Sequence, residues 1–256
     1  MFFSFFIVLT FNLQAQYFVG LNYSPNVSYS EQFATSLVSE SAIIPYLTHG
    51  FAICFSKKLK KKNIELETGY RHNTYKVGIH YNEDIPREDK GFSKQIFQWY
   101  QLKQIPFIVN YTFKNQSTEK KDKSQKETEK EPFCSIGGGL IFCFDAIVQY
   151  KDAFEEKIDI AYGGKTYSRN NLLLGGANGA LNTFLINYNF TYHYPLKKYS
   201  EIYLALEHNV GLKPIVGANL IVGTSIDGMN PIKTNVVTSS TGSSLGLRIG
   251  YRYRIK

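Results

Sequence analysis

The chain has 256 residues, of which 43% are hydrophobic, and it carries a formal net charge of +8. It contains no run of about 18 apolar residues, which excludes a membrane-spanning helix. The positive charge does not indicate a nucleic-acid partner, because Lys and Arg gather in two predicted turns, residues 57–62 and 114–130, and acidic residues nearly balance the second.

The N-terminal residues resemble a secretory signal peptide. An apolar stretch from Phe2 to Phe11 is too short to span a bilayer, and it is followed by the small residue Ala15. No Lys or Arg precedes the stretch, and Leu13 stands where a small residue is preferred. We interpret residues 1–15 as a signal peptide and residues 16–256 as the mature domain, with a buried N-terminal strand as the alternative.

Eight segments of alternating apolar and polar residues follow, each bounded by turn-forming residues. Each has about 11 to 17 residues, whereas about 9 to 11 tilted residues suffice to cross a membrane. The excess should project beyond the bilayer. We expect strands at Tyr17 to Ser28, Tyr46 to Ser56, Ile64 to Ile79, Phe97 to Phe113, Phe133 to Gln149, Thr183 to Pro195, Glu201 to Val216 and Ser243 to Ile255.

The last strand shows the alternation most clearly. From Leu245 to Ile255 every second residue is apolar or aromatic, and glycine or arginine occupies the positions between. Such a strand has one apolar face and one polar face. Lipid outside and a polar lumen produce this pattern, whereas a soluble barrel with an apolar cavity would invert it.

The aromatic content fits the same environment. The chain has 19 Tyr and 19 Phe, and the Tyr tend to lie near strand ends, where interfacial girdles place them. The sequence therefore predicts an all-β fold, an eight-stranded antiparallel up-and-down transmembrane β-barrel. We expect it to be integral to the cell outer membrane, with the lipid bilayer of that membrane as its first partner.

Connection lengths predict the orientation. Counted from the N-terminus, the first, third, fifth and seventh connections are long and should lie outside the cell, while the second, fourth and sixth should be periplasmic turns. The fourth connection is longer than this rule predicts for a periplasmic turn. Its residues 114–131 are charged, of low complexity and without an apolar side chain, which predicts a disordered periplasmic turn.

Three segments resemble a known family. Tyr100, the pair Ile105-Pro106 and the alternation that ends at Phe113 are similar to the fourth strand of the small outer-membrane barrels common in Bacteroidetes, often called PorT-like. The glycine-rich Phe133 to Leu140 and the final Leu245 to Tyr253 match as well. The resemblance covers residues 16–256. It implies an eight-stranded outer-membrane barrel and an accessory role in a secretion or gliding apparatus.

The final strand also resembles the assembly signal of outer-membrane proteins, polar-x-Gly-x-x-apolar-x-apolar. The matching residues are Arg248, Gly250, Tyr253 and Ile255. This resemblance implies that the outer-membrane assembly machinery inserts the chain. The sequence departs from the signal in lacking a terminal Phe, since Ile255 and Lys256 end it.

Charged residues on the inward faces should pair. An eight-stranded barrel is just wide enough for its own side chains, so we expect no solute channel. Antiparallel pairing of the last two strands, with Glu201 near Ile255, brings Glu207 level with Arg248 to Gly250 and predicts a Glu207–Arg248 ion pair. We expect a structural role for this network, whose other candidates are Arg252, Glu65, Glu67 and Arg71.

The sequence predicts no catalytic, cofactor or metal site. Of the 5 His residues only His80, near the outer end of the third strand, is placed to suit a lipid-modifying enzyme, and no nucleophile motif accompanies it. The run Gly137-Gly138-Gly139 lacks the Lys and helix of a phosphate loop and predicts tight curvature or close packing. The 3 Cys residues have no metal spacing with His and cannot form a disulfide framework.

Two predicted loops are the candidate binding regions. Tyr150 to Asn182 is charged and interrupted by Gly163-Gly164 and Gly175-Gly176, and Gly217 to Thr241 is polar and nearly uncharged. Binding residues concentrate on loops held by a rigid scaffold. The leading hypothesis is a non-enzymatic outer-membrane barrel that acts as a membrane anchor or binds a protein or surface ligand through residues 150–182 and 217–241. The alternatives are a PorT-like accessory component, a lipid-modifying enzyme and a soluble ligand carrier.

Overall fold

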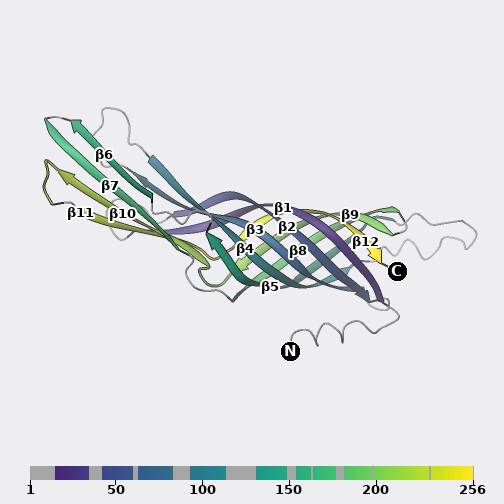
Figure 1. The fold of residues 1–256 in the computed structure, drawn as a ribbon. Helices are drawn as coiled ribbons and strands as arrows, with labels where there is room; N and C mark the ends of the chain where they lie inside the picture. The colour runs from purple at the N-terminus through teal and green to yellow at the C-terminus, as the bar shows by residue number, and fades with distance from the viewer. Residues whose placement is uncertain are drawn as a thin grey trace, which may run out of the picture.

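The computed structural model describes residues 15–34, 42–59, 63–82, 93–113, 131–148, 154–162, 164–176, 182–197, 199–230 and 232–255. These residues form one 12-stranded antiparallel sheet (Figure 1). Within this part of the chain, no helix is long and apolar enough to cross a membrane. Residues 1–14 of the predicted signal peptide and residues 114–130 of the charged segment lie outside the described residues.

Eight of the strands close into a barrel, which confirms the predicted fold class. The last strand pairs with the first, so that Tyr17 lies opposite Ile255. Each of the other barrel strands pairs with the barrel strands that precede and follow it along the chain. The barrel strands are β1 (Ala15–Ala34), β2 (Ala42–Leu59), β3 (Ile64–Asn82), β4 (Ser93–Thr112), β5 (Phe133–Val148), β8 (Thr183–Lys197), β9 (Ser200–Gly211) and β12 (Ser244–Ile255).

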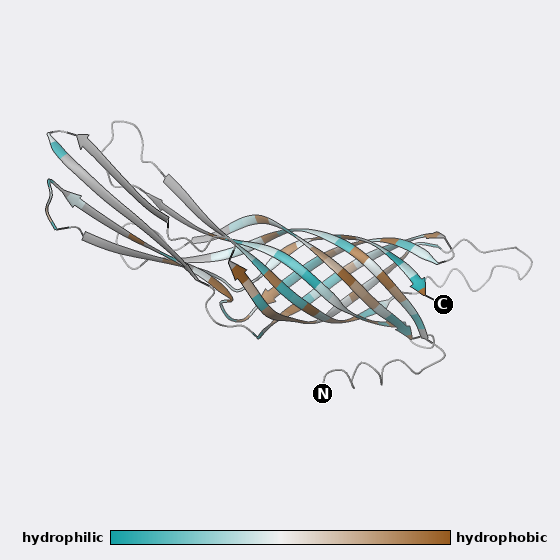
Figure 2. Ribbon diagram, viewed as in Figure 1, coloured by the Kyte–Doolittle hydropathy of each residue, from teal (hydrophilic) through white to brown (hydrophobic). Residues whose placement is uncertain are grey.

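The outward face of the barrel is apolar and exposed. Figure 2 shows hydrophobic and hydrophilic residues alternating along the barrel strands. Water would penalise such a surface, whereas lipid accepts it. On β4 the exposed apolar residues do not extend as far as Lys103, which faces outward. Its Nζ lies 2.7 Å from Asp145 Oδ2. Two exposed polar side chains, His49 and His208, interrupt the belt. The belt includes Leu21, Leu47, Phe51, Ile53, Phe55, Phe107, Val109, Ile136, Leu140, Phe184, Tyr188, Phe190, Leu204, Leu206, Leu247 and Ile249.

The two ends of the barrel differ. Both Ala15 and Ile255 lie at one end, together with the β2–β3, β4–β5 and β8–β9 connections (Figure 1). We call this the turn end. Four further strands extend beyond the opposite end, which we call the hairpin end.

The prediction of loops at residues 150–182 and 217–241 is wrong. The first contains β6 (Phe154–Tyr162) and β7 (Lys165–Gly176), and the second contains β10 (Val216–Ile226) and β11 (Ile232–Ser240). Asp227 and Gly228 lie in the turn of the second hairpin with positive φ angles of 50° and 75°, a backbone conformation that Asp and Gly adopt readily in turns. The polar composition favoured loops, but a strand that extends beyond the barrel has no need of an apolar face.

The predicted strand Glu201 to Val216 is also wrong at its end. Strand β9 stops at Gly211, and Val216 begins β10. Pro214 lies between them and has no N–H to donate to a neighbouring strand. The chain therefore leaves the barrel wall at this point and crosses the hairpin end.

Strand β1 joins the hairpins to the barrel. Its N-terminal part pairs with β12 as far as Ser28, which lies opposite Ser244, and residues 31–34 then pair with residues 236–239 of β11. From β11 the sheet continues through β10 and β7 to β6. The hairpins are thus held to the barrel by continuous backbone hydrogen bonding.

Candidate functional site

The structure places all six predicted lumen residues inside the barrel. Because side chains alternate along a strand, Glu65, Glu67 and Arg71 share the inward face of β3, opposite to the exposed Tyr70. Glu207 on β9 and both Arg248 and Arg252 on β12 face inward by the same rule. All six are buried.

Four of them form a central network of Glu67, Arg71, Glu207 and Arg248. Arg248 Nη1 donates to Glu67 Oε1 at 2.5 Å, and Arg71 Nη1 donates to Glu207 Oε1 at 2.5 Å. Each arginine also approaches the other carboxylate, Arg71 to Glu67 at 3.4 Å and Arg248 to Glu207 at 3.3 Å. Two positive and two negative charges therefore compensate one another inside the barrel.

The Glu207–Arg248 ion pair exists, but the register used to predict it is wrong. Glu207 lies opposite Gly246, and Glu201 lies opposite Arg252 instead of Ile255. The arginine side chain is long enough to cover the difference along the strand. The 3.3 Å contact brings Arg248 Nε near Glu207 Oε2 without hydrogen-bond geometry, since both atoms lack a hydrogen-bond partner.

A second cluster, the turn-end network, consists of Glu65, His193, Glu201 and Arg252. Arg252 binds both Glu65 and Glu201, and His193 Nδ1 lies 2.8 Å from Glu201 Oε1. Sequence reasoning missed His193 and Glu201. The outward positions of Tyr192, Tyr194 and Ile202 put both inside by parity, and the short β8–β9 turn brings them within two register positions of each other.

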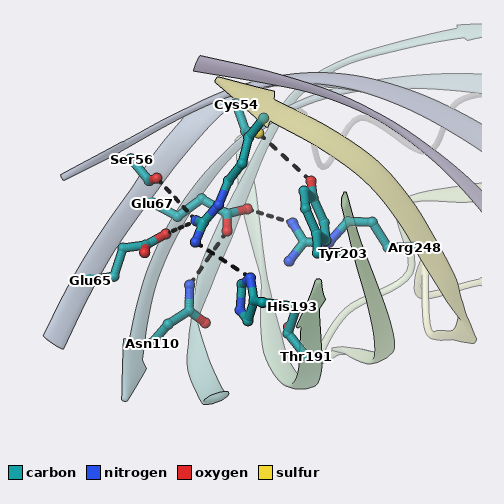
Figure 3. A pocket seen from close by; sticks show the side chains of 10 residues that line it. Cys54, Ser56, Glu65, Glu67, Asn110, Thr191, His193, Tyr203 and Arg248 are labelled. Atoms are coloured by element: carbon teal, nitrogen blue, oxygen red, sulfur yellow. Dashed lines mark hydrogen bonds and ion pairs between the residues drawn. The ribbon is translucent and has the colours of Figure 1, made fainter. Parts of the chain in front are cut away.

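A small cavity separates the two networks. Figure 3 shows Glu65, Glu67, His193, Tyr203 and Arg248 directed into the shared space between the strands. Its volume is about 10 Å³, roughly the room that a single water needs. Among the described residues, no group of three or more His, Cys, Asp or Glu side chains is arranged to hold a metal ion.

Apolar side chains fill the lumen at the hairpin end. The segment after β9 contributes Ile215 and Val216, which pack against inward residues of the wall. The lumen is therefore closed by a cluster of Tyr75, Val77, Tyr100, Leu102, Ile141, Cys143, Leu185, Ile215 and Val216. At this level β3 no longer pairs with β2 through its backbone, and the Thr74 hydroxyl donates to the His49 carbonyl at 2.8 Å instead.

The four residues of the predicted assembly signal lie on both faces of β12. Arg248 belongs to the central network, and Tyr253 and Ile255 face outward and are exposed. A Cβ at Gly250 would lie 2.3 Å from Cζ of Tyr203, so the glycine makes room for that ring. Recognition of these residues by an assembly machine remains a prediction.

Comparison with known proteins gives a likeness of fold. No family model and no curated protein matches the chain. The outer membrane protein OprG from Pseudomonas aeruginosa matches with a TM-score of 0.45 and 10% identity, over 94% of this chain and 96% of that one. Neisserial surface protein A matches with a TM-score of 0.39 and 10% identity, over 93% and 97% of the two chains.

Proposed function

We propose that the chain is an outer-membrane barrel that anchors an extended β-sheet outside the cell as a binding surface. The observation that carries this proposal is the continuous pairing of β1 with β11, which holds β11, β10, β7 and β6 as one sheet beyond the barrel. A binding surface on a rigid scaffold loses less conformational entropy on binding than a free loop would.

The closed lumen supports a surface role. Two ion-pair networks and an apolar cluster fill the interior, and the cavity between them has a volume of about 10 Å³. Passage of a solute would require removal of side chains that are fully buried, Leu102 and Leu185 among them. The hairpin end, by contrast, offers backbone for pairing, because β6 pairs only with β7 among the described strands.

Connection lengths support the orientation. The long connections of such barrels lie outside the cell and the short turns in the periplasm. The hairpin end carries the two longest connections between barrel strands, and the turn end includes a β8–β9 link of only a few residues, 198–199. We therefore assign the hairpin end to the cell exterior.

Cysteine labelling of intact cells tests this assignment. Met229 is 70% exposed beside the β10–β11 turn, and Glu131 is exposed at the turn end. In a Cys134→Ser background, whose remaining cysteines are buried, we expect a membrane-impermeant maleimide to label Met229→Cys in intact cells. The control Glu131→Cys should react only after the outer membrane is permeabilised. The reverse pattern would contradict the orientation, and labelling of neither variant before lysis would contradict exposure at the cell surface.

A further inference from the structure

Three side chains at the turn end lie in the order of a nucleophile, a base and an orienting acid. Ser135 Oγ lies 3.0 Å from His193 Nε2, and His193 Nδ1 lies 2.8 Å from Glu201 Oε1. They come from β5, β8 and β9, and all three are buried. Both distances fall in the range of a hydrogen-bonded nucleophile and base. The binding role proposed above does not involve these residues.

The partners of His193 fix its protonation pattern. A carboxylate only accepts hydrogen bonds, so Nδ1 must carry the proton that faces Glu201. In the neutral ring Nε2 is then an acceptor, and the Ser135 hydroxyl donates to it. This is the tautomer in which a histidine can remove a proton from a serine.

Neighbouring charges favour a transient imidazolium. Arg252 binds Glu201 and Glu65, which keeps Glu201 ionised and oriented toward the ring. Arg252 Nη2 lies 3.4 Å from Nδ1 and opposes a positive ring, but the two carboxylates outnumber it. The net charge of these three groups is −1, which offsets part of the cost of placing a positive charge on this buried histidine when Ser135 loses its proton.

The three residues lie near the turn end of the barrel. Ser135 is the third residue of β5, and Phe133, the first, stacks on His193 with ring centroids 4.4 Å apart and an angle of 11°. Phe133 is half-buried and therefore covers the histidine from the rim. His193 also lines the cavity of about 10 Å³ shown in Figure 3, which has no room for a long acyl chain.

We propose that Ser135 is a nucleophile that accepts the acyl group of small, water-soluble acyl esters arriving from the turn end. The serine oxygen bonds to the ester carbonyl carbon while its proton moves to His193 Nε2. The carbon–oxygen bond to the leaving alcohol then breaks, and that alcohol takes the proton from His193. The product is an ester on Ser135, which water hydrolyses by the same proton path in reverse.

Covalent labelling of the purified, folded barrel tests the proposal. We expect a fluorophosphonate probe to modify Ser135 and p-nitrophenyl acetate to acetylate it, as read by mass spectrometry of the peptide. His193→Asn, which keeps a polar side chain, should slow labelling by about 100-fold or more, the usual contribution of a general base. Phe133→Ala should accelerate labelling because it uncovers the ring.

Ser28→Ala is the matched control. Ser28 is a buried serine of β1 whose hydroxyl donates to the Tyr46 carbonyl, outside the turn-end network, and its replacement should leave labelling unchanged. Each variant is first shown to keep its heat-dependent gel mobility, so that loss of folding is separated from loss of reactivity. Labelling of Ser135 at the same rate in His193→Asn would overturn the proposal. So would the absence of labelling in both the wild type and Phe133→Ala.

Discussion

Replacement of Arg248 by methionine should destabilise the folded barrel by about 3–5 kcal/mol, the usual cost of removing one partner from a buried ion pair. Arg248 is 1% exposed and contacts both carboxylates of the central network. Without it, Glu67 and Glu207 share the single charge of Arg71. The measurement is the urea concentration at which the folded species disappears from unheated gels.

A double variant separates charge compensation from packing. Arg248→Met with Glu67→Gln leaves Arg71 and Glu207 as a neutral pair at 2.5 Å. We expect it to recover most of the lost stability, since the uncompensated carboxylate is gone. The control is Arg254→Met, whose guanidinium lies over the Tyr199 ring at the turn end, and which should cost about 1 kcal/mol or less. Equal losses in all three variants would contradict the network.

The second large effect is expected at Gly139, where alanine should cost about 3 kcal/mol through overpacking. A Cβ at Gly139 would lie 2.0 Å from the Phe107 carbonyl oxygen and 2.8 Å from the Ile108 Cα. Both atoms belong to the backbone of β4, so relief requires separation of two paired strands. The same urea measurement on unheated gels detects the change.

The adjacent glycines provide an internal series. A Cβ at Gly137 would meet the side chain of Asn110 at 1.9 Å, and one at Gly138 would meet nothing nearer than 3.2 Å. Because a side chain moves more easily than paired backbone, Gly137→Ala should cost less than Gly139→Ala, and Gly138→Ala least. The reverse order would show that close strand approach is not what these glycines provide.

The strands and faces of the barrel were predictable because a period of two is a local property. Leu21, Phe107 and Leu204 face outward, as the alternation indicates. The same parity places Ser135, His193 and Glu201 inside. The hydrogen bonds between them depend on the register of β5, β8 and β9, which alternation does not specify.

Register and the outer sheet were less predictable. Strands β9 and β12 are joined through β10 and β11, so no tight turn sets their alignment, and the predicted pairing of Glu201 with Ile255 was wrong. The turn Asp227-Gly228 was a visible hairpin signal. The attachment of that hairpin to residues 31–34 is a contact between distant parts of the chain, and no local pattern encodes it.

Gel mobility of the protein in isolated outer membranes tests the central claim, a closed barrel in the outer membrane. A closed barrel with paired β1 and β12 should resist detergent at room temperature and migrate differently after boiling. We predict a heat-dependent shift in the outer-membrane fraction. Recovery of the protein as a soluble species with the same mobility before and after boiling would contradict the account.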